Sequence, residues 1–243
     1  MRDSDHHLFY CENITGDTIT LDSGESNHAV SVLRVRVGDL IQVTDGRGTI
    51  YECQCADVRK QSISCNIQNK TVIPRIIPEL TLLVGLPDKE HFETILEHAT
   101  ALGVRRVVPL IMDHCRKPWW ESWDKLSQRF TSKMIVSMKQ CLYPCIPHLD
   151  APVSLGNVID TCDKPLIVAG QHGKKLSDAD ISPYKKLTCL IGPPGGMSSG
   201  ETKLLELRNP LIISVAAARL RTELASAAVC SRIMSAFLCP AAV

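Results

Sequence analysis

The sequence lacks the features that mark several classes of protein. Its 243 residues hold no apolar run near the roughly 20 residues of a membrane-spanning helix, and the polar residues 1–7 lack the apolar stretch of a secretory signal. Excess charge is also missing, because 27 Lys and Arg residues oppose 26 Asp and Glu residues. There is no internal repeat or low-complexity segment. We therefore expect a globular protein of the cytoplasm, without a membrane partner, in which any attraction to nucleic acid comes from local basic patches.

Templates for disulfides and zinc sites are missing as well, although the chain has 11 cysteines. The count is odd, and spacings such as Cys53-x-Cys55 repeat neither kind of template. We interpret the cysteines as reduced thiols that serve as small apolar side chains. The histidines at 98, 114 and 172 have no ligand-like spacing, so no metal is expected.

Short strand-like runs dominate residues 1–72 and predict a small β-barrel. The runs cover residues 18–21, 40–43, 50–53 and 63–67, and a helical stretch interrupts them at 25–33. The pattern of short strand-like runs ends near three prolines at positions 74, 78 and 87. We therefore place a domain boundary here, with one domain at 1–72 and a second at 73–243.

From residue 80 onward, strand-like runs alternate with longer helical patterns. The expected strands are 80–86, 107–111, 166–169, 187–191 and 211–215, and the expected helices are 88–102, 121–141, about 199–207 and a last one that runs through Phe237. This alternation predicts an α/β domain with a mostly parallel sheet, in which ligands bind beyond the carboxyl ends of the strands.

The loop at residues 191–198, Ile-Gly-Pro-Pro-Gly-Gly-Met-Ser, follows one of these strands. Its glycines would let main-chain groups approach a flat ligand, and Ser198-x-x-Glu201 predicts a capping box at the start of the next helix. The Lys-Ser/Thr of a phosphate-binding loop is missing, which disfavours a nucleoside triphosphatase. Spacing alone leaves two readings open, a ligand loop and a plain strand-to-helix turn.

Four segments in matching order resemble the 16S ribosomal RNA uracil-N3 methyltransferases, a family of the knotted SPOUT class. Residues 191–198 are similar to the family's Ile-Gly-Pro-Glu-Gly-Gly-Phe-Ser, and residues 219–225, Arg-Leu-Arg-Thr-Glu-Leu-Ala, to its Ile-Leu-Arg-Thr-Glu-Thr-Ala. Residues 28–39 match its His-x-x-x-Val-Leu-Arg-x-x-x-Gly-Asp, and residues 99–104 its Ala-Thr-Glu-Leu-Gly-Val. The ordered set spans nearly the whole chain.

The resemblance implies a PUA-like β-barrel, a SPOUT domain with a trefoil knot, a homodimer, and S-adenosylmethionine as the methyl donor. The substrate would be N3 of a uridine in 16S rRNA, met as RNA or in the assembled small ribosomal subunit. The donor would lie against three loops, around Gln171 and the residues Ala169, Gly170, Ile191, Gly192, Pro193, Gly195, Gly196, Met197, Ile213, Val215, Ala216 and Leu220.

Two residues are candidates for the chemistry that the resemblance implies. Arg221 could stabilise negative charge that develops on the uracil oxygens, and Glu223 could accept the N3 proton or orient Arg221. The alternative for this pair is an ordinary salt link at the start of a helix. We predict RNA contacts at His28, Arg34, Arg36 and Arg116.

Tryptophans at 119, 120 and 123 cluster beside Arg116 and Lys117. They could form a surface on which bases stack, but packing within the domain or at an interface is the interpretation that we prefer.

Departures from the family pattern keep alternatives open. Pro194 stands at the family's glutamate, Ala216 at a usual glycine and Leu224 at its second threonine. An RNA-binding homologue with impaired catalysis is therefore one alternative hypothesis, and a SPOUT methyltransferase that acts on a different RNA is another.

Overall fold

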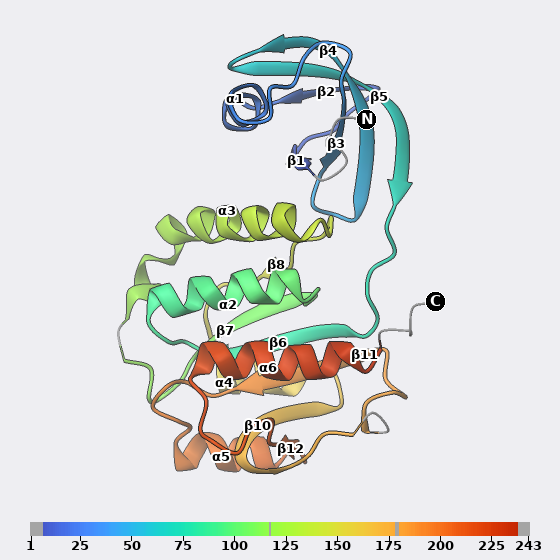
Figure 1. Ribbon diagram of the computed structural model, residues 1–243. Coiled ribbons are helices and arrows are strands. Elements are labelled where there is room, and N and C mark those ends of the chain that lie inside the picture. The colour runs from blue at the N-terminus through green and yellow to red at the C-terminus, as the bar shows by residue number, and fades with distance from the viewer. Residues whose placement is uncertain (1–6, 117, 178–179, 238–243) are drawn as a thin grey trace. The chain divides into compact units, whose positions relative to one another are not determined.

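The computed structural model describes residues 7–116, 118–177 and 180–237. Contacts within the chain divide it into two units, one of residues 1–75 and 135–146 and one of residues 76–134 and 147–243 (Figure 1). Within the described ranges, no helix combines the length and apolar character needed to cross a membrane. Residues 1–6, which belong to the polar start, and Lys117 lie outside these ranges.

The first unit is built on a five-stranded sheet. In order across the sheet, its strands are β1 (Leu8–Tyr10), β3 (Leu40–Thr44), β4 (Thr49–Arg59), β5 (Ser62–Val72) and β2 (Thr18–Leu21). The pair β1–β3 is parallel and the other pairs are antiparallel. Helix α1 (Ser23–Ser31) follows β2, and the side chain of its N-cap residue Asp22 accepts a hydrogen bond of 2.8 Å from the N–H of Glu25.

Every second side chain along part of β4 points into the core of this unit. Tyr51, Cys53 and Cys55 are buried while Glu52 and Gln54 are exposed, which is the period of two that a half-buried strand requires. Cys55 lies directly opposite the buried Cys65 of β5. The cysteines in the described part of the chain are free thiols, and most of them are buried like small apolar side chains, whereas Cys141 is exposed.

A later segment, residues 135–146, completes the first unit. The N–H of Gly48 donates to the carbonyl of Pro144 at 2.7 Å, and that of Ile146 donates to the carbonyl of Gly46 at 3.0 Å. Lys139 also forms an ion pair with Glu25. The turn at residues 45–48 between β3 and β4 is therefore held by a part of the chain about a hundred positions away.

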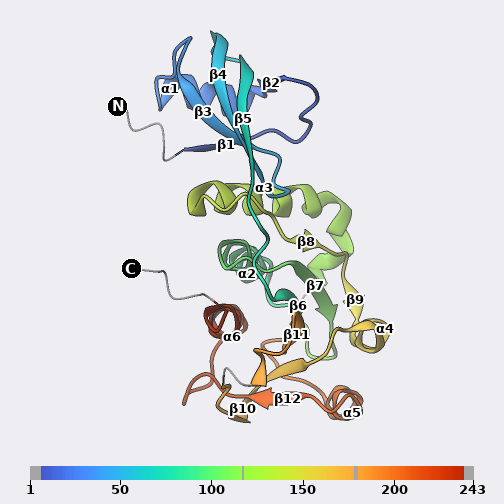
Figure 2. The same cartoon turned by 90° about the vertical axis from the view of Figure 1, so that its right-hand side faces the viewer.

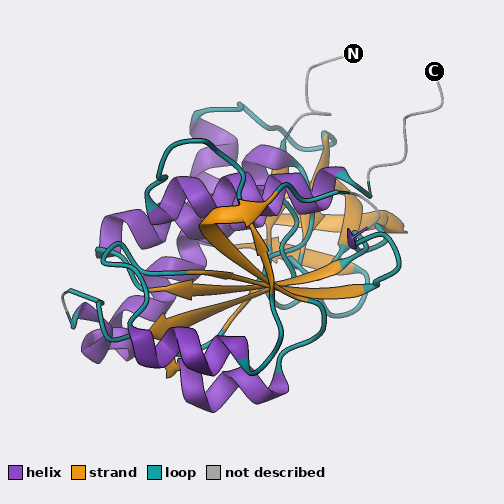
Figure 3. Cartoon of the chain, turned by 90° about the horizontal axis from the view of Figure 1, so that it is seen from below, coloured by secondary structure: helices purple, strands orange, loops and turns teal. Residues whose placement is uncertain are grey.

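The second unit contains a seven-stranded sheet whose pairs, among the described strands, are all parallel. Its order is β12 (Leu211–Ile213), β10 (Leu166–Lys174), β11 (Lys186–Ile191), β6 (Glu79–Gly85), β7 (Arg106–Ile111) and β8 (His148–Leu149), and β9 (Val153–Ser154) also pairs with β7. Seen end on, the strands of this sheet fan out, as they do in twisted open sheets (Figure 3).

Helices cover both faces of this sheet. Figure 2 shows α2 (Lys89–Ala101) and α6 (Thr222–Ser235) on one face, and α4 (Leu155–Val158) and α5 (Ser199–Glu206) on the other. Buried aliphatic side chains of β6, β7, β10 and β11 pack against α4 and α5. The predicted α/β class with a parallel sheet is confirmed, and the trefoil knot stays a prediction of the resemblance.

The tryptophan cluster lies before and at the start of α3 (Trp123–Cys141), where η2 (Trp119–Ser122) is a short 3₁₀ helix. The ring of Trp119 lies 5.5 Å from that of Phe92 and 5.7 Å from that of Phe130, both fully buried. Its indole N–H donates to the carbonyl of Pro87 at 2.9 Å. The preferred interpretation, packing within the domain, is therefore confirmed for Trp119.

Candidate functional site

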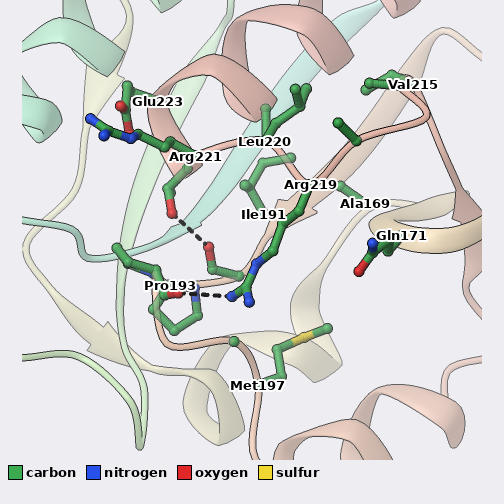
Figure 4. Close-up of a pocket in the computed structure, with 18 of the residues that line it drawn as sticks. Ala169, Gln171, Ile191, Pro193, Met197, Val215, Arg219, Leu220, Arg221 and Glu223 are labelled. Atoms are coloured by element: carbon green, nitrogen blue, oxygen red, sulfur yellow. Dashed lines mark hydrogen bonds between the residues drawn. The ribbon is translucent and has the colours of Figure 1, made fainter.

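A cavity of about 530 Å³ lies at the carboxyl ends of β10, β11 and β12. Its volume is in the range of small-molecule sites. Ligands of parallel α/β domains bind at this edge of the sheet, because the loops that follow the strands meet there. Part of the lining comes from β10, from the loop after β11, and from the segment that runs from β12 into the start of α6 (Figure 4). The start of α2 and Arg116, which follows β7, complete it.

The cavity brings together nearly all of the residues that the sequence marked as a donor site. These are Ala169, Gly170, Gln171, Ile191, Gly192, Pro193, Gly196, Met197, Ile213, Val215, Ala216 and Leu220. Arg116, Arg221 and Glu223 also line it. Gly195 is the one predicted donor residue that the lining leaves out.

The loop after β11 turns back sharply within residues 193–196. The N–H of Gly196 donates to the carbonyl of Pro193 at 2.8 Å, which closes the turn. Gly196 has a φ of +82°, a conformation that glycine adopts without the steric cost of a β-carbon. A β-carbon at Gly196 would meet no atom within 4 Å, so this glycine borders open space in the cavity. The main chain is thus accessible to a flat ligand.

Gly195 faces the protein, where His114 packs against it. A β-carbon on Gly195 would lie 2.7 Å from the β-carbon of His114. The Nδ1 atom of His114 is also 2.9 Å from the carbonyl oxygen of Gly196 and can donate a hydrogen bond to it. His114, which sequence reasoning did not select, therefore holds the glycine pair, and its position just after β7 is the signal that could have found it.

A network of side chains fixes the end of the same loop. The hydroxyl of Ser198 accepts from the N–H of Glu201, and the carboxylate of Glu201 accepts from the N–H of Ser198 at 2.8 Å, so the predicted capping box is confirmed. The other oxygen of Glu201 accepts from the N–H of Asp113, and Ser198 donates to the Asp113 carboxylate. Because Asp113 follows β7, the start of α5 is tied to the segment after that strand.

Two hydrogen bonds tie the loop after β11 to the segment before α6 and to the first residue of that helix. Arg219 donates to the carbonyl of Pro194 at 2.9 Å, and the hydroxyl of Thr222 donates to the carbonyl of Gly192 at 3.2 Å (Figure 4). Main-chain oxygens of the glycine-proline loop therefore set the position of the segment that carries Arg221 and Glu223.

The cavity has an apolar part and a polar end. Figure 4 shows Arg221 and Glu223 at one end of the lining and Ala169, Gln171 and Val215 at the other. Arg221 is the N-cap residue of α6, and Glu223 lies in the first turn of that helix. No ion pair within the described ranges joins these two side chains. The carboxylate of Glu223 instead lies 3.9 Å from Nε2 of His91 in α2.

Asp88 and His91 also line the polar end, and sequence reasoning missed both. Their position soon after β6 could have indicated them, because ligands bind beyond the carboxyl ends of parallel strands. Within the described ranges, no three His, Cys, Asp or Glu side chains are grouped to hold a metal ion.

The remaining residues that we predicted to contact RNA lie in the first unit. His28 is in α1, and Arg34 and Arg36 follow that helix. All three are exposed, as RNA contact requires, and none lines the cavity. Arg116 is the predicted RNA-binding residue that the cavity includes.

A ligand cavity at the carboxyl edge of a parallel sheet, bordered by a glycine loop, defines a small-molecule-binding α/β domain, here linked to a small β domain. Comparison with known families gives this class a name. Residues 75–234 match the model of the RNA methyltransferase domain, and residues 21–68 match that of the RNA methyltransferase PUA domain. The chain belongs to this family of RNA methyltransferases, and its first unit contains the family's PUA-like domain.

Curated relatives resemble the chain over nearly its whole length. The ribosomal RNA small subunit methyltransferase E of Aquifex aeolicus is 28% identical over 231 residues, which cover 94% of this chain and 99% of the relative. The protein of the same name from Mycobacterium bovis is 23% identical over 230 residues, with 90% and 88% covered.

Solved structures share the fold. A probable rRNA methyltransferase from Porphyromonas gingivalis superposes with a TM-score of 0.83 at 25% identity and covers 96% of this chain and 99% of its own. The ribosomal RNA small subunit methyltransferase E of Neisseria gonorrhoeae, solved with bound S-adenosyl methionine, has a TM-score of 0.82 at 20% identity, with 94% and 97% covered.

Proposed function

We propose that this protein transfers a methyl group from S-adenosylmethionine to N3 of a uridine in 16S rRNA of the small ribosomal subunit. The observation that carries the proposal is the cavity, in which β10 around Gly170 meets the loops around Gly192 and Val215. Curated relatives named for methylation of small-subunit ribosomal RNA support the same substrate.

The residues of the cavity fit the donor. Open space beside Gly196 gives a planar ring access to main-chain atoms, and Ile191, Met197 and Ile213 supply apolar contacts. When bound, S-adenosylmethionine supplies an electrophilic methyl group on a positively charged sulfur. The loops would hold that group in line with the attacking nitrogen, which replaces a chance encounter by a fixed geometry.

Arg221 and Glu223 would act on the uridine. Loss of the N3 proton leaves negative charge on the uracil ring and its oxygens, and a guanidinium beside the cavity would stabilise that charge as it develops. The carboxylate of Glu223 lies in the same part of the lining and would assist removal of the proton.

The departures from the family pattern are compatible with methyltransferase activity. Pro194 contributes its carbonyl oxygen to Arg219, a role that any residue can fill. The side chain of Leu224 is exposed and lies outside the lining. Pro194 and Ala216 both line the cavity, where Ala216 adds one methyl group relative to glycine. Catalysis is therefore favoured over the binding-only alternative.

The exposed residues His28, Arg34 and Arg36 would bind the RNA from the PUA-like domain, and Arg116 would do so beside the cavity. A net charge of only +1 suits recognition of a folded particle by shape and local charge, so we favour the assembled small subunit as the substrate. We also propose that the protein acts as a homodimer in the cytoplasm.

Mass spectrometry of nucleosides from 16S rRNA tests the proposal. A strain without the gene should lose N3-methyluridine, and the wild-type gene should restore it while the Arg221→Ala gene should not. Unchanged N3-methyluridine in the deletion strain would refute the substrate. Calorimetry with S-adenosylmethionine tests the alternative of an RNA-binding homologue that has lost the donor site. That alternative predicts no heat of donor binding.

A further inference from the structure

The polar end of the cavity contains a histidine that the proposed chemistry has not used. His91 lies in the first turn of α2, and its Nε2 atom is 3.9 Å from Oε1 of Glu223 in the first turn of α6. The side chain of His91 is 43% exposed and that of Glu223 is 18% exposed, so the imidazole is the more accessible of the two. Two helices thus present a base and a carboxylate to the same space.

We propose that His91 accepts the N3 proton of the target uridine and that Glu223 stabilises the resulting imidazolium. The inference rests on the function proposed above. In the step, the N3–H bond breaks, its electron pair stays on N3, and the proton bonds to Nε2 of His91. The lone pair on N3 then takes the methyl group, while the electrons of the broken carbon–sulfur bond stay on sulfur.

Charge in the cavity supports this assignment. Proton transfer creates one cation and one anion, and each has a counter-charge in the lining. The carboxylate of Glu223 faces the imidazolium, and the guanidinium of Arg221 is available to the uracil oxygens. A histidine is also the side chain that changes charge between about pH 5 and 8, so it can take up and release a proton in each turnover.

Other charged groups also line the cavity together with His91. Asp88 lies one turn before it as the N-cap residue of α2, and Arg116 lines the cavity from the segment after β7. A neutral imidazole is the form that can accept a proton.

The test compares His91→Gln with His98→Gln, a matched control because His98 lies on the same helix, is exposed and is outside the cavity lining. Single-turnover methylation at saturating donor should fall about 100-fold or more in His91→Gln and stay unchanged in His98→Gln. The wild-type rate should fall on acidification, because a protonated base cannot accept the N3 proton, and that pH dependence should be lost in His91→Gln. Donor affinity by calorimetry should match the wild type.

Two further measurements separate proton transfer from a structural role. Added imidazole should raise the rate of His91→Ala but not that of Arg221→Ala. By NMR, the ring signals of His91, but not those of His98, should move when an RNA fragment with the target uridine binds.

The outcomes distinguish the two proposals. An active wild type with a His91→Gln rate within about threefold of it, or with an unchanged pH profile, overturns the inference alone. A wild type that binds the donor but forms no N3-methyluridine overturns the proposed function, and this inference with it.

Discussion

At the scale of single residues, hydrogen bonds to main-chain carbonyl oxygens fix the loop that borders the donor cavity. The carbonyl oxygens of Gly192, Pro194 and Gly196 each accept from a side chain of another segment. A loop held in this way loses little further conformational freedom when a ligand binds. The residues that hold the loop, His114, Arg219 and Thr222, therefore matter for affinity although two of them are exposed.

Arg221→Ala separates chemistry from donor binding. Because the guanidinium is expected to act on the uracil oxygens, its loss should lower turnover about 10²- to 10³-fold. Donor affinity, measured by calorimetry, should change little. Arg219→Ala is the matched comparison, since Arg219 holds Pro194 and its loss should weaken donor binding instead. Near-normal turnover in Arg221→Ala would remove that residue from the mechanism.

Gly195→Ala should displace the glycine loop. Its new β-carbon would lie 2.7 Å from that of His114, closer than real β-carbon contacts come, so either the loop or the His114 segment must move. Donor affinity should fall, and a Gly195→Ala, His114→Gly double variant should recover part of it. If the donor binds Gly195→Ala as tightly as it binds the wild type, the loop is not the cradle.

Buried cysteines make the stability of the first unit depend on alkaline pH. Burial raises the pKa of the Cys53 thiol from 9.0 to about 12, so the folded protein keeps a proton that the unfolded chain releases at lower pH. The contribution is fully present below about pH 9 and is lost as the pH rises toward 12. Cys65 changes stability in the same direction, because its hydrogen bond with Cys55 and its burial raise its pKa.

Urea unfolding at several alkaline pH values measures this loss. The decrease in unfolding free energy above pH 9 should be shallower for Cys53→Ala than for the wild type. Cys141→Ala, which changes an exposed cysteine, is the control and should keep the wild-type slope. Equal slopes in all three proteins would contradict the role of Cys53.

At the scale of elements, the start of α5 links helix stability to loop position. Ser198 caps the helix and also donates to Asp113 after β7, so one side chain serves two elements. Sequence reasoning found the capping box, because the Ser-x-x-Glu spacing is local. It could not find the bond to Asp113, which is 85 positions away and depends on the pairing of strands.

Ser198→Ala should therefore lower the unfolding free energy by about 1 kcal/mol through the lost cap. It should also weaken donor binding, because the loop that ends at Ser198 lines the cavity. Ser199→Ala is the matched control, since Ser199 is the first helical residue and makes neither hydrogen bond. Thermal unfolding and calorimetry measure the two effects, and equal behaviour of the two variants would contradict this account.

At the scale of the whole molecule, periodicity predicted the fold better than it predicted the site. The alternation of strands and helices from residue 80 onward gave the parallel sheet, because hydrophobic spacing is a local property. Strands of two or three residues, such as β1 and β8, are too short to leave a periodic signal. Nor could spacing show that residues 135–146 belong with the first unit.

The site residues that lie in contiguous motifs could be predicted from the sequence, and those that only tertiary packing brings to the cavity could not. Contiguous motifs marked the loop after β11 and the segment before α6, and the cavity joins them. His91 and His114 were not selected, since a lone histidine in a sequence is more often structural than functional. Only the packing of α2 against α6, and of the segment after β7 against the glycine loop, places them at the cavity.

The central claim is that main-chain atoms of residues 191–197 hold the adenosyl part of the methyl donor. A crystal structure of the protein with S-adenosylmethionine tests it most directly. The account predicts electron density for the donor in the cavity, with its ring against Gly196 and its methyl group directed toward Arg221 and Glu223. A donor bound elsewhere, or a cavity without density at saturating donor, would contradict it.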